Sequence, residues 1–313
     1  MTRVLVTGGA GYVGSVLVGQ LLERGYKVKV IDNLRKGGLG LISYFANPNL
    51  EFIKGDIRDS VAVEKTLGDV EVVIHLAAVV GQPACDKDPW AAKQINLEGT
   101  KNIIAKRSRQ QLVIFASTLS NYGTVVGQIC TEEMDPRPLT LYAITKEEAE
   151  RYLLEVGNVI ILRPATAFGL SPQMRLDLLL NDFVYRAVKE GKLDLFESDF
   201  VRAFIHVRDF TYGLIFSIEN AEKMIDKIYN LGDESLNLTK RELAERIKQH
   251  VEFKLSISDS GGDPDRRNYR VDFSRIKTLG YRTCISIDQG IEELVRAMPI
   301  LEVKSHFSNP SYY

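Results

Sequence analysis

The sequence predicts an α/β fold in which a doubly wound parallel sheet carries helices on both faces and a smaller α/β lobe follows. Apolar runs of strand length alternate with helical patterns through the first half of the chain. A glycine-rich turn joins the first of these runs to the first helix. The length of 313 residues, with 45% of them hydrophobic, is enough for a full doubly wound domain and a smaller one.

Six apolar runs predict the strands of the sheet, near residues 3–7, 27–32, 50–54, 70–76, 112–116 and 159–163. Strands that alternate with helices at these intervals are typical of a parallel sheet, so we expect residues 1–164 to form the first domain. After Pro164 the regular alternation of strand and helix patterns ends. Helices are expected near residues 174–190, 207–219, 239–251 and 288–298. Residues 165–313 should therefore form mainly a lobe over the carboxyl ends of the strands, with short returns to the first domain.

The turn after the first strand contains Gly8, Gly11 and Gly14, three residues apart, with Gly9 as an extra glycine. Glycines there let the backbone turn tightly, approach a pyrophosphate and pack the following helix on the sheet. The spacing is unusual, because the familiar fingerprint has one residue between its first two glycines and this chain has two. Three glycines alone are compatible with an ordinary tight turn, but the strand before them and the helix after them favour a dinucleotide site.

The second predicted strand ends at Asp32, about 20 residues beyond the turn. An acid at this place can accept hydrogen bonds from an adenosine ribose, and its charge would repel a 2′-phosphate, which favours NAD over NADP. Arg35 and Lys36 lie close enough in the sequence to accept that phosphate, so NADP stays open on this evidence. A solvated acid at a strand end is the alternative interpretation of Asp32.

Tyr142 and Lys146 lie four residues apart on a predicted helix and therefore share a face. A phenol is a poor base at neutral pH, but a neighbouring ammonium and a positive nicotinamide favour the phenolate. Tyr-x-x-x-Lys is common by chance, and a surface tyrosine beside a solvated lysine is the alternative. Combined with the glycine turn, the pair predicts hydride-transfer chemistry.

Composition excludes several other classes of function. The formal net charge is −1 without a basic run, so neither nucleic acid nor an anionic membrane is an expected partner. The first residues run directly into the first predicted strand, so we expect no signal peptide, and no apolar stretch approaches the length of a membrane span; a soluble, cytoplasmic protein is expected. Cys85, Cys130 and Cys284 have no metal-ligand spacing, so no metal is expected, and they are interpreted as reduced packing residues. Trp90 is likewise expected to pack in the interior.

Ordered motifs along almost the whole chain resemble the extended short-chain dehydrogenase/reductase superfamily, and within it the NAD-dependent nucleotide-sugar epimerase/dehydratase group. The resemblance implies a Rossmann-type sheet with a nucleotide-sugar lobe. It rests on residues 7–14, Asp32, residues 55–57, 75–78, Asn96, residues 115–118, Tyr122-Gly123, and residues 142–146, 162–169 and 206–209.

The resemblance also implies roles for individual residues. Tyr142 would take the proton from a sugar hydroxyl while hydride leaves for NAD, Lys146 would bind the nicotinamide ribose, and Thr118 would bind the same sugar oxygen. The alternative interpretation of Ser117 and Thr118 is structural: they would be residues at a strand end that cap a turn, without binding a ligand. The implied cofactor-binding residues are Gly8, Gly11, Tyr12, Val13, Gly14, Asp32, Asn33, Asp56, Ile57, Leu76, Ala77, Ala78, Asn96, Ser117, Tyr142 and Lys146.

Departures from the family pattern restrict the reaction. The 4,6-dehydratases of this group carry an Asp-Glu pair after the threonine, where this chain has Leu119 and Ser120, so dehydration by that mechanism is not expected. Oxidation at C4 of the sugar remains, followed either by re-reduction, as in an epimerase, or by release of the ketone, as in a dehydrogenase. The motifs look especially like enzymes that oxidise C4 of GDP-heptose in capsule biosynthesis.

The predicted lobe carries candidate contacts to a sugar-nucleotide diphosphate. Arginine forks suit phosphate, and Asn181 falls where the family places an asparagine on the phosphates. The arginines are Arg175, Arg202, Arg266 and Arg267. Homodimers are usual in the family, through two helices that here would span residues 89–108 and 141–155.

Two other functions stay open. An NAD(P)H-dependent reductase of a small carbonyl compound would prefer NADPH, and Asp32 counts against it. A dinucleotide sensor without turnover would not need Tyr142, Lys146 and Thr118 together.

Overall fold

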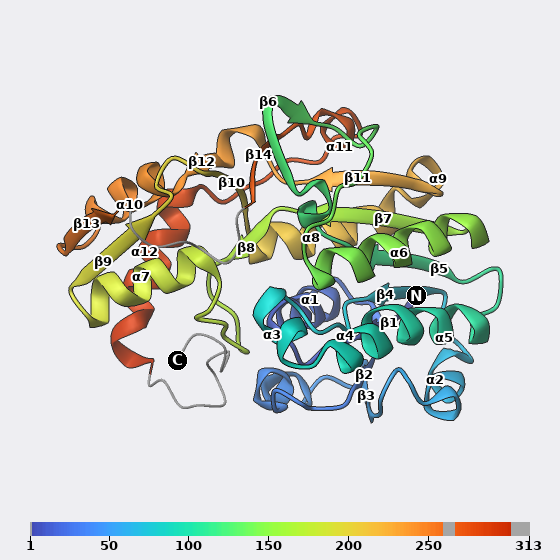
Figure 1. The fold of residues 1–313 in the computed structure, drawn as a ribbon. Coiled ribbons are helices and arrows are strands. Elements are labelled where there is room, and N and C mark those ends of the chain that lie inside the picture. Colours follow the sequence, from blue (N-terminus) through green and yellow to red (C-terminus); the bar gives the residue numbers. More distant parts are fainter. Residues whose placement is uncertain (1, 259–266, 302–313) are drawn as a thin grey trace.

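The chain folds around a seven-stranded parallel sheet, which occupies the right-hand part of Figure 1. The computed structural model describes residues 2–258 and 267–301. The strand order is β11-β7-β5-β4-β1-β2-β3, and every neighbouring pair is parallel. These strands are β1 (Arg3–Thr7), β2 (Lys27–Asp32), β3 (Leu50–Lys54), β4 (Val72–His75), β5 (Leu112–Ala116), β7 (Val159–Pro164) and β11 (Lys227–Leu231). The predicted Rossmann-type fold is confirmed.

Both faces of the sheet are covered by helices, because successive side chains of a strand point to opposite faces. In β1, Val4 and Val6 pack into the core under α1 and α8, whereas Leu5 packs into a second core under α2, α5 and α6. The covering helices are α1 (Tyr12–Glu23), α8 (Val207–Glu219), α2 (Ser60–Leu67), α5 (Gly99–Lys106) and α6 (Leu141–Val156). The order reverses between β1 and β4, which creates the crevice where open α/β sheets bind ligands.

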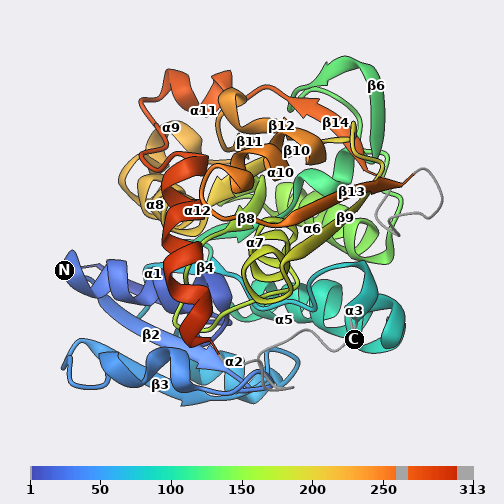
Figure 2. The same cartoon turned by 90° about the vertical axis from the view of Figure 1, so that its left-hand side faces the viewer.

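The remaining elements form a smaller lobe, on the left of Figure 1 and toward the viewer in Figure 2. A separate apolar cluster joins Phe183, Leu195, Leu243 and Ile291 across this lobe. Its elements include β8 (Thr166–Phe168), α7 (Leu179–Lys189), β9 (Lys192–Phe196), β10 (Val201–His206), β12 (Asn237–Thr239), α10 (Lys240–Lys248), β13 (Lys254–Ser258), β14 (Asn268–Val271) and α12 (Ile287–Ala297). The domain boundary at residue 164 stays a prediction.

Further short elements complete the described part of the chain. They are η1 (Leu39–Tyr44), α3 (Gln82–Lys87), α4 (Pro89–Lys93), η2 (Gln94–Glu98), η3 (Leu119–Tyr122), β6 (Thr124–Cys130), α9 (Ala221–Met224), η4 (Glu234–Leu236), α11 (Ser274–Thr278) and η5 (Met298–Ile300).

Two helix predictions were wrong in their bounds. The helix expected from residue 174 begins at Leu179, because residues 169–177 form a loop whose carbonyl groups accept hydrogen bonds from Tyr12 and Asn181. The single helix expected over residues 89–108 is divided into α4, a π-helical turn at η2 and α5. A π-turn widens a helix by one residue and is frequent at functional sites, and this one contains Asn96.

Two packing predictions were also wrong. Cys85 and Cys130 are buried, but Cys284 is exposed, because it follows α11 on a surface segment. Trp90 lies on the outer side of α4 with 68% of its surface exposed. Within residues 2–258 and 267–301, no helix is long and apolar enough to cross a membrane. The same residues contain no cluster of three or more His, Cys, Asp or Glu side chains that could hold a metal ion.

Candidate active site

The glycine turn between β1 and α1 has a shape that larger residues cannot adopt. Gly8 has φ +72°, and a Cβ there would lie 2.8 Å from the backbone of Ala77. A Cβ on Gly14 would collide with the carbonyl oxygen of Gly8. Among the described residues, α1 receives no side-chain cap and has no acid in its first turn. Its first amide groups therefore form a positive helix end that fits the pyrophosphate of a dinucleotide.

Asp32 lies beside this turn, at the end of β2. Its carboxylate accepts hydrogen bonds from the backbone N–H of Ala10 at 3.0 Å and of Leu34 at 2.8 Å. Burial raises the pKa of Asp32, and these two hydrogen bonds oppose the rise. Each carboxylate oxygen uses one acceptor position in these bonds, and the remaining positions suit ribose hydroxyls.

The next strand, β3, brings a second acid to the same edge. The carboxylate of Asp56 accepts hydrogen bonds from Arg58 at 2.8 Å and from Asn33 Nδ2 at 3.1 Å. The bond from Arg58 holds the pKa of Asp56 well below its usual range. Asp56 is therefore ionised and fixed beside Asn33, where the sequence predicts the adenine end of the cofactor.

His75, at the end of β4, is a buried structural residue. Thr7 Oγ1 accepts from the N–H groups of Leu76 and Ala77, so its own proton is donated to His75 Nδ1, 2.7 Å away. Thr100 Oγ1 donates to the Asn96 carbonyl and therefore accepts from His75 Nε2 at 2.9 Å. This network requires a neutral ring, and burial lowers the pKa of His75 to about 3. It fixes the segment that is predicted to line the cofactor.

Asn96 lies in the π-turn and is almost fully buried. Its Oδ1 accepts from Val79 N at 2.8 Å, and its Nδ2 donates to Val79 O at 3.0 Å and Thr145 Oγ1 at 3.2 Å. Thr145 is the residue before Lys146 on α6. Asn96 therefore ties the loop after β4 to the helix that carries the predicted catalytic pair.

Tyr142 and Thr118 come from different elements, and the hydroxyl of Thr118 lies close enough to Tyr142 to act on its pKa. The hydroxyl of Thr140 caps α6 by accepting from Ala143 N at 3.2 Å, which places Tyr142 in the first turn of the helix. Thr118 follows β5. Burial raises the pKa of Tyr142 to about 12, against the positive charges of Arg175 and Arg267 and the nearby hydroxyl of Thr118.

Lys146 is 3% exposed and lies one helical turn beyond Tyr142. Its Nζ is 3.9 Å from the centre of the Phe115 ring, an attractive position for a cation. Burial lowers the pKa of Lys146 to about 7, while the charge of Glu150 raises it. Within the described residues, no hydrogen bond to this ammonium is made, so its three donors fit the ribose hydroxyls of a bound dinucleotide.

Ser120 connects the predicted base to the predicted phosphate-binding region. Thr118 Oγ1 donates to Ser120 Oγ at 2.9 Å, and the guanidinium of Arg267 donates to the same oxygen. The structure thus brings Arg267 and Arg175 close enough to Tyr142 to act on its pKa. Ser120 contributes a hydroxyl to this arrangement and no carboxyl group.

Sequence reasoning missed a buried ion pair beneath the site. Arg163 donates to both carboxylate oxygens of Glu150, at 2.7 Å and 3.0 Å, and to the hydroxyl of Tyr122 at 3.1 Å. Asn121 also donates to Glu150, at 2.9 Å. Glu150 lies four residues after Lys146, and this i, i+4 spacing was the signal that could have found it.

Asn181 and Arg202 were predicted to bind the substrate phosphates, and both side chains are buried in the structure. Asn181 is fully buried, and its amide is bonded to Gly169 N, Arg175 O and the Tyr12 hydroxyl. Arg202 is 2% exposed in β10, and its guanidinium donates to Val201 O at 3.3 Å. Both roles on the substrate phosphates stay predictions, and Arg266 lies outside the described residues.

The remaining cofactor residues follow one strand end after another. Ser117 is buried after β5, and its hydroxyl accepts from Asn121 Nδ2 at 3.3 Å. The others form the edge predicted for the dinucleotide, Gly11, Tyr12 and Val13 after β1, Ile57 after β3, and Leu76, Ala77 and Ala78 after β4.

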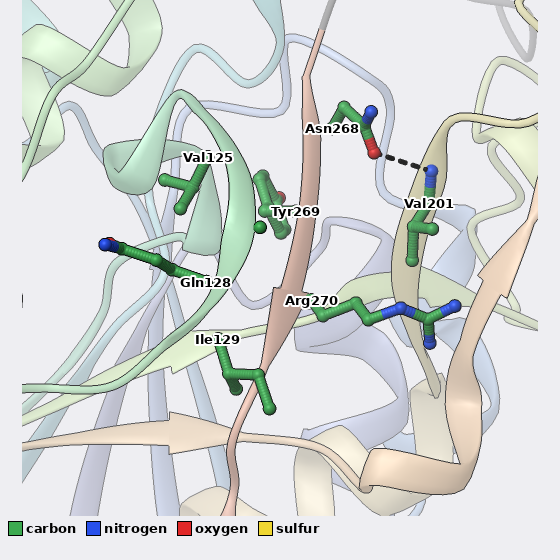
Figure 3. Close-up of a pocket in the computed structure, with 8 residues that line it drawn as sticks. Val125, Gln128, Ile129, Val201, Asn268, Tyr269 and Arg270 are labelled. Atoms are coloured by element: carbon green, nitrogen blue, oxygen red, sulfur yellow. Dashed lines mark hydrogen bonds between the residues drawn. The ribbon is translucent and has the colours of Figure 1, made fainter.

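A separate hollow of about 300 Å³ lies between β6, β14 and β10 (Figure 3). Asn268 Oδ1 accepts from Val201 N at 3.0 Å along one wall. The sequence predicts no catalytic or binding role for any residue that lines this hollow. The lining residues are Val125, Gly127, Gln128, Ile129, Val201, Asn268, Tyr269 and Arg270. The candidate active site is therefore assigned to the strand ends, where the predicted residues gather, and not to this hollow.

Residues 4–232 match the model of the NAD dependent epimerase/dehydratase family. The chain belongs to this family. The match includes the glycine turn, Thr118, Tyr142 and Lys146, and it confirms the predicted family and its cofactor, NAD. NAD would supply hydride-transfer chemistry when bound, and the residues described above would hold its pyrophosphate and riboses.

Relatives in this family carry out several reactions. The low-salt glycan biosynthesis protein Agl12 of Haloferax volcanii is 28% identical over 93% of this chain and 97% of its own. A dTDP-glucose 4,6-dehydratase of Streptomyces venezuelae, solved with NAD, is 28% identical over 94% of this chain and 96% of its own, with a TM-score of 0.84. A UDP-glucose 4-epimerase of Thermotoga maritima, solved with UDP-glucose, is 26% identical over 95% and 99%, with a TM-score of 0.83.

Proposed function

We propose that this enzyme oxidises C4 of a nucleotide-diphosphate sugar, with Tyr142 as the base. The observation that carries the proposal is that Tyr142 and Lys146 lie one turn apart on α6, with Thr118 close to Tyr142 after the end of β5. In the proposed step, Tyr142 takes the O4 proton while hydride leaves C4 for the nicotinamide. One C–H bond and one O–H bond break, a C=O bond forms, and two electrons reduce the cofactor.

Thr118 and Lys146 would support this step in different ways. The Thr118 hydroxyl would position the sugar oxygen against Tyr142. The Lys146 ammonium, together with the positive nicotinamide, would lower the pKa of Tyr142 from the high value that burial gives it in the free protein.

We propose that the substrate diphosphate binds between Arg175 and Arg267. Both guanidinium groups lie close enough to Tyr142 to lower its pKa, so positive charge is available near the proposed base. The guanidinium of Arg175 is already oriented by Asp177, whose carboxylate accepts from Nε at 3.0 Å. A preoriented fork suits phosphate oxygens. Which sugar and base are held stays a prediction, with GDP-heptose suggested by the sequence motifs.

The site favours an epimerase or a dehydrogenase over a 4,6-dehydratase. Elimination of water needs an acid and a base after Thr118, and Leu119 and Ser120 cannot supply a carboxyl group. We therefore expect no 4-keto-6-deoxy product.

An assay of product and cofactor separates the two reactions. Purified enzyme would be unfolded to identify released dinucleotide by mass, and native enzyme incubated with GDP-, UDP-, ADP- and dTDP-sugars. A changed C4 centre without lasting absorbance at 340 nm would establish an epimerase, and a ketone with NADH would establish a dehydrogenase. A lack of turnover with all of these sugar nucleotides would contradict the proposal.

We also propose a homodimer formed through α4, α5 and α6. Trp90 on α4 and Ile144 on α6 expose 68% and 38% of their surfaces, on helices that contact each other. Large exposed apolar side chains on neighbouring helices are typical of an interface. A second copy with the same surface would cover both residues by two-fold symmetry.

A further inference from the structure

The hydroxyl of Tyr12 connects the cofactor turn to the smaller lobe. Tyr12 is the first residue of α1, and its hydroxyl donates to the carbonyl oxygen of Gly169 at 2.7 Å, across 157 positions of the sequence. The same hydroxyl accepts from Asn181 Nδ2 at 3.4 Å. Asn181 Oδ1 in turn accepts from the N–H of Gly169 at 2.9 Å. Both backbone polar groups of Gly169 are therefore held.

A second set of bonds joins the same two segments. Ser171 Oγ donates to the carbonyl oxygen of Tyr12 at 2.7 Å and lies 3.0 Å from Ser15 Oγ. Ser171 Oγ also accepts from the N–H of Gln173 at 3.2 Å. The first turn of α1 is thus bonded to residues 169–173 through side chains and backbone alike.

These bonds lie in the interior, where water does not compete with them. Tyr12, Ser171 and Gln173 are less than a tenth exposed, and Ser15 and Asn181 are fully buried. A buried hydroxyl that loses its partner carries the cost of desolvation, so the arrangement is strongly specified. Burial also raises the pKa of Tyr12, so its hydroxyl keeps the proton that it donates.

The bonded segment leads directly to Arg175. Asn181 Nδ2 donates to the Arg175 carbonyl at 2.9 Å, and Asp177 orients the guanidinium. Arg175 is therefore fixed through its backbone by Asn181 and through its side chain by Asp177. The hydroxyl of Tyr12, which follows the glycine turn, accepts a hydrogen bond from the same Asn181 side chain.

We propose that Tyr12 is a positioning residue that couples the dinucleotide-binding turn to the loop 169–177 and so sets the place of Arg175. The part of the inference that concerns substrate rests on the proposed function, in which Arg175 meets the diphosphate. A ligand that orders the turn orders the loop through the same bonds. By linkage, a diphosphate held by the loop strengthens NAD binding to the same extent.

Hydrogen exchange tests the coupling without any substrate. The N–H groups of Gly169 and Gln173 are reporters, because their acceptors are Asn181 and Ser171. In the full-length protein with NAD, we expect Tyr12→Phe to accelerate exchange in a peptide over residues 169–177 about fivefold, since one hydrogen bond contributes about 1 kcal/mol. Addition of NAD should slow this peptide in the unsubstituted protein and have a smaller effect in the variant.

Tyr281→Phe is the matched control. Its hydroxyl is equally buried and donates to a backbone carbonyl, that of Asp209, at 2.9 Å. This variant should lose similar stability yet leave exchange over residues 169–177 unchanged. Unchanged exchange in Tyr12→Phe, or equal acceleration in both variants, would overturn the proposal.

Kinetics then separate this inference from the proposed function. With a nucleotide sugar that turns over, Tyr12→Phe should raise KM about fivefold and lower kcat much less, whereas a general loss of folded enzyme lowers kcat alone. Altered exchange without turnover of any nucleotide sugar would support the coupling and contradict the proposed substrate. An unchanged KM in an enzyme that is active would overturn the role assigned to Arg175.

Discussion

At the scale of single residues, the proposed chemistry depends on how the protein lowers the pKa of the Tyr142 hydroxyl so that it can act as a base. The pKa of Tyr142 is raised to about 12, chiefly by burial, which opposes that role. Positive charge has to counter it, and the protein brings Arg175 and Arg267 near the same hydroxyl and Lys146 one helical turn from Tyr142. Lys146 itself has a pKa lowered to about 7 by burial, and the charge of Glu150 helps to keep its ammonium.

Tyr142→Phe should bind NAD and lose turnover by about 10³-fold, because general acid–base catalysis contributes about 10²- to 10⁴-fold. Titration of the variant with NAD would check binding, and the rate with a nucleotide sugar would check catalysis. Full activity in a variant that binds NAD would show that another group is the base.

Some of the site could be predicted from residue spacing, and some could not. The four-residue spacing of Tyr142 and Lys146 places them on one helix face in any α-helix. The hydrogen bond of the Tyr12 hydroxyl could not be predicted from spacing, because its partner Gly169 is distant in sequence and accepts only through its backbone carbonyl. Asn181 was found by family position, but burial and its bonds in the free protein depend on the packed lobe.

At the scale of elements, buried polar networks fix the strand ends that form the crevice. The chain from Thr7 through His75 to Thr100 joins β1, β4 and α5. The pair of Glu150 and Arg163 joins α6 to β7 and reaches β11 through Tyr122 and Asn230. Sequence periodicity predicted the strands but not these connections, because polar partners carry no periodic signal.

The neutral state of His75 has a consequence for acid stability. Burial lowers its folded pKa to about 3, whereas the unfolded ring binds a proton near pH 6.5. The unfolded state therefore gains protons first, and stability falls as pH drops below about 6.5. Between pH 6.5 and 5 this loss should be about 2 kcal/mol and absent from His75→Gln. Urea unfolding at pH 7 and pH 5 measures it, and an identical pH dependence in both proteins would refute the assignment.

Arg163→Met should destabilise the protein by about 3–5 kcal/mol, because it leaves the Glu150 carboxylate buried without its cation. The double variant Glu150→Gln with Arg163→Met should recover part of this loss. Denaturant unfolding of the three proteins gives the free energies. A loss below about 1 kcal/mol in the single variant would mean that the pair is not buried in solution.

At the scale of the whole molecule, the order of apolar runs was sufficient to predict the doubly wound sheet. Strands β1, β2, β3 and β5 have the predicted bounds, because each is a short apolar run ended by a turn. The lobe was harder to predict, since its two- and three-stranded sheets pair segments distant in sequence. The division of the helix over residues 89–108 depends on the tertiary bonds of Asn96.

The proposed dimer predicts that Trp90→Glu weakens self-association at least tenfold, because burial of a charge in an apolar interface is costly. Sedimentation over a range of concentrations would measure it. Val61→Glu, at an exposed apolar residue on α2, is the control. A monomer in the unsubstituted protein at all concentrations would contradict the dimer.

The central claim is that C4 of the sugar gives hydride to NAD. The most direct measurement is a single turnover with a nucleotide sugar that carries deuterium at C4, followed by mass analysis of cofactor and product. We predict a slower reaction than with the unlabelled sugar. The deuterium should be found on the cofactor as reduced NAD, or returned to C4 with inverted stereochemistry. Product formed at an unchanged rate, with the label lost to water, would contradict the account.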